Sequence, residues 1–179
     1  MRKALYSNRA KDAVRSLVLA GLTVLGGMIW FSAEMCLAQN QSNKLPASPI
    51  KAFLSSETQA IIPGTPFTLF VVFEIEPGWH IYYKDPGQSG MPTQVDLILP
   101  KGFTAQALSW PPAETFKDAG IVTYGYSKKV RLSTKVTPSK ALKPGESIKV
   151  KATTSWLACK HSCVPGDSSI SLDLKVQTK

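Results

Sequence analysis

Alternation of apolar and polar residues with period two is the dominant pattern along this chain. It is clearest over residues 66–76, where every second side chain is apolar: Phe67, Leu69, Val71, Phe73 and Ile75. Such alternation is typical of a β-strand with one buried face. The stretch ends at Pro77-Gly78, a pair that favours a turn. We therefore predict a central strand here, with its apolar side chains in the core.

Shorter segments of the same kind surround this strand, and Gly and Pro residues separate them. Residues 111–120 are predicted to be a loop, because Pro111-Pro112 opens them. No long helical period occurs outside the N-terminal segment. Short strands at a spacing of roughly 8–12 residues favour an all-β sandwich. The further predicted strands are residues 50–54, 79–83, 93–99, 103–110, 121–126, 130–136, 148–157 and 168–176.

Residues 1–38 have the layout of a secretory signal peptide. A basic start is followed by an apolar run over residues 17–31, and small residues at Cys36 and Ala38 mark a cleavage site. The alternative is an uncleaved membrane anchor, because the apolar run is long for a signal peptide. We expect cleavage and export to the periplasm, a flexible lead-in over residues 39–49, and one domain over residues 50–179.

The net charge of the chain does not alter the prediction of an exported all-β domain. Removing residues 1–38 takes away five Lys/Arg and two Asp/Glu, which lowers the formal charge from +9 to +6. The remaining lysines are scattered, so we expect a moderately basic surface and no nucleic-acid binding. About 140 residues would remain, the usual size of one domain. We expect a monomer, with membrane contact only through an uncleaved signal.

Two of the three cysteines, Cys159 and Cys163, would survive cleavage. A strand-like run precedes Cys159, and the alternating segment 168–176 follows Cys163. Between them and this last strand, residues 164–167 have turn chemistry. We therefore predict that the pair lies at the mouth of a hairpin, within disulfide reach, in a compartment that permits disulfides.

The pair has two interpretations that spacing does not separate. A disulfide that closes so short a loop stabilises a fold by only about 2 kcal/mol, which suits a bond that is exchanged with other thiols. A plain structural disulfide is equally common in exported proteins. Lys160 and His161 lie between the cysteines and would favour a thiolate if they were near it, or they are simply exposed loop residues.

Other chemistry finds less support in the sequence. Cys159, Cys163 and His161 could hold Cu(I) or Zn(II), but His80 is the only other histidine, so we predict no metal and no cofactor. No phosphate-binding loop, nucleophile elbow or metalloprotease helix occurs. Glu114 and Asp118 are expected to be solvated rather than a catalytic pair.

Several blocks together resemble a known family, the N-terminal periplasmic domain of the thiol:disulfide interchange protein DsbD, in particular its branch in ScsB-type copper-resistance reductases. The resemblance extends from about residue 50 to the end of the chain. The blocks are Gly78-Trp79-His80-Ile81-Tyr82-Tyr83, Pro86-Gly87, Gly90-Met91-Pro92-Thr93, Leu99-Pro100-Lys101-Gly102-Phe103, Trp110-Pro111-Pro112, Tyr124-Gly125-Tyr126, and Trp156-Leu157-Ala158-Cys159 with Cys163-Val164-Pro165.

The resemblance implies an immunoglobulin-like sandwich whose cysteines relay electrons from a membrane-embedded thiol reductase to oxidised, thioredoxin-like periplasmic proteins. Links to cytochrome c biogenesis and copper resistance are implied too. Cys163 matches the cysteine that bonds to partners, and Cys159 the resolving one. Phe116 matches a shielding aromatic on a cap loop, with Glu114 near its acidic position. Tyr82 and Tyr83 match aromatics close to the active site.

Two departures from the family pattern change what we expect. The cysteine spacing differs from that of the best-known DsbD, and the chain ends after this domain. The electron donor is then expected to be a separate polypeptide. The domain is either a component of a thiol:disulfide oxidoreductase or, alternatively, a non-enzymatic immunoglobulin-like interaction or copper-binding module with a structural disulfide.

Overall fold

The computed structural model describes residues 48–178, and the predicted signal peptide and most of the predicted lead-in lie outside this range. Within it every regular element is a β-strand, and no helix is long and apolar enough to cross a membrane. The strands are β1 Ile50–Ser56, β2 Ala60–Ile61, β3 Phe67–Ile75, β4 His80–Gly87, β5 Gln94–Ile98, β6 Thr104–Ala105, β7 Glu114–Asp118, β8 Ile121–Tyr126, β9 Val130–Thr137, β10 Ser147–Cys159 and β11 Cys163–Val176.

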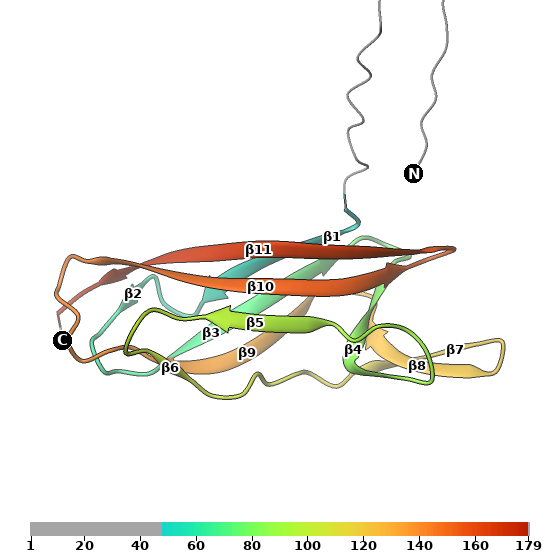
Figure 1. Ribbon diagram of the computed structural model, residues 1–179, viewed down its shortest axis with the longest axis horizontal. Helices are drawn as coiled ribbons and strands as arrows, with labels where there is room; N and C mark the ends of the chain where they lie inside the picture. The colour runs from blue at the N-terminus through green and yellow to red at the C-terminus, as the bar shows by residue number, and fades with distance from the viewer. Residues whose placement is uncertain (1–47, 179) are drawn as a thin grey trace, which may run out of the picture. The chain divides into compact units, whose positions relative to one another are not determined.

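The strands form two sheets that pack face to face. One has the order β1-β3-β9-β6, and the other has β2-β11-β10-β4-β8-β7, with β5 paired to part of β10. All pairs are antiparallel except β2 with β11. The fold is the predicted all-β, immunoglobulin-like sandwich. Figure 1 shows the long β10–β11 hairpin running along the domain, with β4, β7 and β8 at the end where the hairpin turns.

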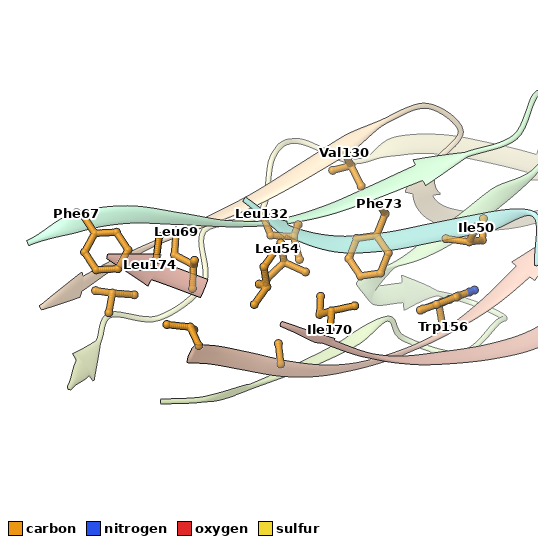
Figure 2. Close-up of a cluster of buried hydrophobic side chains, with 14 of the residues drawn as sticks. Ile50, Leu54, Phe67, Leu69, Phe73, Val130, Leu132, Trp156, Ile170 and Leu174 are labelled. Carbon is orange, nitrogen blue, oxygen red and sulfur yellow. The ribbon is translucent and has the colours of Figure 1, made fainter. Parts of the chain in front are cut away.

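The core lies between the two sheets and confirms the face predicted for β3. Phe67, Leu69, Val71 and Phe73 are all buried. The Phe73 ring meets the Trp156 ring of β10 edge to face, with centroids 5.7 Å apart. Figure 2 shows both rings among the buried aliphatic side chains of the two layers. This contact ties the central strand to the part of β10 that leads into Cys159.

Two segments differ from the prediction around the loop before β8. Residues 103–110 form only the short β6 and one isolated bridge, Ser109 to Ser133. Residues 114–118, predicted as loop, form β7, which pairs with β8 over five residues. Most β7 side chains are exposed, so no alternation marks it. Ala119 and Gly120 between the strands both have positive φ, as a two-residue hairpin turn requires.

The predicted turn at residues 164–167 is also wrong, because these residues belong to β11. The β10–β11 ladder is continuous from Ser147 opposite Lys175 to Cys159 opposite Cys163. On its other side β11 pairs with β2 only at Lys175 and Val176, so Pro165 and Gly166 lie on a sheet edge. Proline is tolerated on an edge strand. Gly166 is required for packing, since a Cβ there would collide with the Trp156 indole.

Candidate functional site at the tip of the long hairpin

The disulfide closes the tip of the β10–β11 hairpin. Cys159 is the last residue of β10 and Cys163 the first of β11, and the two are direct cross-strand partners with Cα atoms 4.1 Å apart. The turn between them is stabilised by the Lys160 N–H, which donates to the Ser162 carbonyl at 3.1 Å. The prediction that the pair lies at a hairpin within disulfide reach is therefore confirmed, but the turn falls between the cysteines and not at residues 164–167.

The two cysteines differ sharply in exposure. Cys159 is only 4% exposed, because β4 pairs with the end of β10 and places His80 directly opposite it. Cys163 is exposed, since within residues 48–178 no strand pairs with the start of β11 on its outer side. An incoming thiolate must reach a sulfur along the S–S axis. The arrangement makes Cys163 the more accessible of the two sulfurs and covers Cys159.

A cavity of about 280 Å³ lies beside the disulfide and is lined by both cysteines. His80 and Tyr82 of β4 and Phe116 of β7 form its aromatic wall. Because side chains alternate along a strand, residues 80 and 82 share the face of β4 that looks onto the disulfide. The site thus joins three segments that lie far apart in the sequence.

The Tyr82 hydroxyl is hydrogen-bonded to one sulfur of the pair. Its hydroxyl lies 3.5 Å from Cys159 Sγ, and because a disulfide sulfur carries no proton, the hydroxyl is the donor. The side chain is buried. Its carbonyl accepts a 2.6 Å hydrogen bond from Thr93 Oγ1. Gly90 lies against the ring, where a Cβ would collide with it. These contacts fix the hydroxyl next to the sulfur.

His80 is the site residue that sequence reasoning missed. Its imidazole stacks on Phe116, with centroids 4.7 Å apart and planes 25° apart, and meets the Tyr82 ring edge to face at 5.4 Å. Partial burial lowers the pKa of His80, and the Glu114 carboxylate acts in the opposite direction. The spacing of His80 and Tyr82 on one strand could have indicated a shared face, but its contact with Phe116 comes from a strand 36 positions away.

Glu114 and Phe116 both lie on β7 but have different surroundings. The Glu114 carboxylate accepts hydrogen bonds from the Ser127 N–H at 3.2 Å and the Ser127 hydroxyl at 2.6 Å, which links the start of β7 to the end of β8. Glu114 and Asp118 are both exposed, as expected. Phe116 is half-buried against the cavity. β7 therefore contributes one aromatic ring to the wall of the cavity beside the disulfide.

Tyr83 does not lie at this cavity. It points to the other face of β4, where its ring meets Trp110 at 5.6 Å and Tyr126 at 6.2 Å. The Tyr126 hydroxyl donates to the Pro111 carbonyl at 2.7 Å, and burial, with Tyr83 nearby, raises the pKa of Tyr126 to about 12. This cluster anchors the segment that enters β7, so Tyr83 supports the site from behind.

The three residues between the cysteines, Lys160, His161 and Ser162, also line the cavity. His161 is exposed in the turn. Lys160 extends its side chain across Gly78, where there is room because a glycine occupies the turn between β3 and β4. Within residues 48–178, no three His, Cys, Asp or Glu side chains are grouped so as to hold a metal ion.

Comparison with known proteins identifies the family. The family described as "Thiol:disulfide interchange protein DsbD, N-terminal" matches residues 51–175, and no curated protein sequence matches. Similar solved structures include the N-terminal periplasmic domain of ScsB from Proteus mirabilis (22% identity, TM-score 0.46, 70% of this chain and 44% of that one). The reduced DsbD N-terminal domain of Neisseria meningitidis is another (14%, TM-score 0.44, 71% and 86%). The chain thus spans less than half of the ScsB structure, and by its match to residues 51–175 it belongs to the DsbD N-terminal family.

Proposed function

We propose that this chain is an exported thiol-disulfide interchange domain with Cys159 and Cys163 as its redox centre. It takes electrons from a membrane-embedded thiol reductase and passes them to oxidised, thioredoxin-like proteins in the periplasm. The observation that carries the proposal is the asymmetry of the pair, in which an exposed Cys163 is bonded to a buried Cys159. The family match over residues 51–175 supports it.

The exchange has two balanced steps. A thiolate of the electron donor attacks Cys163 Sγ, a new S–S bond forms between the donor and Cys163, and Cys159 leaves as a thiolate. The donor's second thiolate then attacks the donor sulfur that is bonded to Cys163, and Cys163 is released as a thiolate. The donor ends as a disulfide and the domain as a dithiol, after transfer of two electrons and two protons. Reduction of a downstream protein is the same sequence in reverse.

The groups around Cys159 suit the role of a leaving and resolving thiol. Tyr82 donates a hydrogen bond to Cys159 Sγ, and this bond strengthens as negative charge develops on the sulfur. We propose that Phe116 shields the pair between encounters and that Glu114 holds the strand that carries it, through its hydrogen bonds to Ser127. His161 lies near the pair, at the exposed rim of the cavity.

Changing Tyr82 to phenylalanine should slow reduction of the disulfide about 3- to 10-fold, the effect of losing one hydrogen bond of roughly 1 kcal/mol. The ring, its contact with His80 and its packing on Gly90 all remain. The measurement is the rate of reduction by dithiothreitol at pH 7.5. The matched control is Tyr124→Phe, which alters an exposed tyrosine on β8. Equal rates for the two variants would remove Tyr82 from the mechanism.

The proposed function is tested by equilibrating the oxidised domain with a reduced thioredoxin-like protein over a range of dithiol-to-disulfide ratios. An interchange domain reaches an equilibrium in which both redox forms of each protein are measurable. A structural disulfide stays oxidised at every ratio. Persistence of the Cys159–Cys163 bond throughout would leave the non-enzymatic interaction module as the better description.

A further inference from the structure

The closure of the cavity depends on a small number of contacts. Among the strands that the structure describes, β7 is the outermost of its sheet and pairs only with β8. Four of its five side chains are exposed, and Phe116 is the exception. Segments with few buried contacts open at a low free-energy cost. Figure 1 shows the β7–β8 hairpin at the same end of the domain as the β10–β11 tip. The position of β7 beside the disulfide therefore depends largely on the contacts of the Phe116 ring.

The ring touches His80. We infer that His80 is a positioning residue for the exchange reaction: its stacked imidazole holds Phe116 over the disulfide, and protonation of the imidazole releases it. The inference rests on the proposed function, and it concerns regulation of that same site. His80 is suited to the role because its backbone is fixed opposite Cys159, while its ring contacts both Phe116 and Tyr82 in the wall of the cavity that both cysteines line.

The sign of the pH effect follows from the surroundings of the imidazole. The charged or titratable groups that line the cavity with His80 are Asp118 of β7, Tyr82 of β4, and Lys160 and His161 of the hairpin turn. The Glu114 carboxylate of β7 also acts on the imidazole, although it does not line the cavity. Partial burial is the larger influence and lowers the pKa of His80 below its ordinary 6.5, against the opposing attraction of Glu114. The closed cavity thus favours the neutral ring.

An opened cap returns the imidazole to water, where its pKa is nearer to the ordinary value. The open form then binds a proton more readily than the closed form, so protonation shifts the population toward the open form. Above pH 6.5 the ring is neutral in both forms and the cap stays closed. As the pH falls below 6.5, the disulfide should become more accessible.

The test compares rates of disulfide reduction by dithiothreitol in four proteins: the wild type, His80→Ala, His80→Phe and His161→Ala. At pH 7.5 we expect His80→Ala to react about 2- to 10-fold faster than the wild type, the worth of one lost aromatic pair. His80→Phe keeps an aromatic ring against Phe116 and should react at the wild-type rate. His161→Ala, which alters an exposed histidine of the same cavity, should also match the wild type.

The pH dependence is read as the ratio of the wild-type rate to the His80→Phe rate between pH 5 and 8, because the thiolate fraction of the reagent cancels. The ratio should rise as the pH falls below 6.5. The rate of His161→Ala divided by the rate of His80→Phe should rise equally. A constant ratio, or a wild-type rate in a folded His80→Ala, overturns the inference. If His80→Ala does not fold, the ratio still decides. Because dithiothreitol needs no partner protein, failure here is distinct from failure to equilibrate with a thioredoxin-like protein.

Discussion

Replacing Cys159 by serine should give a chain that traps its partners, whereas replacing Cys163 should give one that forms no mixed disulfide. In Cys159→Ser the exposed Cys163 thiolate still attacks the disulfide of an oxidised thioredoxin-like protein. The mixed disulfide then persists, since no neighbouring thiol resolves it. In Cys163→Ser the remaining thiol of the pair is Cys159, which is 4% exposed and lies under β4. The measurement is a 1:1 covalent complex on a non-reducing gel, confirmed by mass.

The two variants also control for each other in stability. Each removes the same bond, which closes a loop of five residues from Cys159 to Cys163, and each should lower the free energy of unfolding by about 2 kcal/mol. A purely structural disulfide predicts equal losses of stability and no trapping by either variant. The interchange mechanism predicts equal losses and trapping by Cys159→Ser alone. Trapping by Cys163→Ser alone would reverse the roles of the two cysteines.

The features that could be predicted from the sequence are those marked by residues close together in the chain. Alternation at Phe67, Leu69 and Val71 is local and gives both the strand and its buried face. The spacing of Cys159 and Cys163 is local as well, and it placed the pair at a hairpin. β7 was missed because its exposed residues carry no alternation. The turn chemistry at residues 164–167 was outweighed by the β10 ladder, which extends to the cysteines.

The part of the site that local patterns could not reveal is the set of contacts across strands. His80 meets Phe116 only because β8 lies between β4 and β7 in the sheet. That order depends on Gly125, where a Cβ would collide with the Ile81 carbonyl. The family resemblance indicated Phe116 and Tyr82 but gave no role to His80. A contact that depends on strand order needs the three-dimensional structure.

Changing Phe73 to alanine should have the largest effect on stability, lowering the free energy of unfolding by about 3–5 kcal/mol. Phe73 is fully buried between the sheets and is the edge-to-face partner of Trp156. Phe70 lies three residues earlier on the same strand but is only half-buried, under the guanidinium of Arg131 at 3.9 Å. Phe70→Ala should cost about 1 kcal/mol or little more, the worth of an exposed cation–π contact with some lost packing. The measurement is urea denaturation of both variants and the wild type.

The Phe73 and Phe70 variants also distinguish effects on stability from effects on the rate of disulfide reduction. Trp156 and Cys159 lie on the same strand, so a cavity at Phe73 weakens the layer that supports the hairpin tip. The disulfide itself is held by its turn, by β4 and by Tyr82, none of which contains Phe73. At low temperature, where Phe73→Ala is still folded, its disulfide should therefore be reduced by dithiothreitol at nearly the wild-type rate. Equal stability losses for Phe70→Ala and Phe73→Ala would contradict the assignment of the β3 faces, and with it the placement of the core beneath the site.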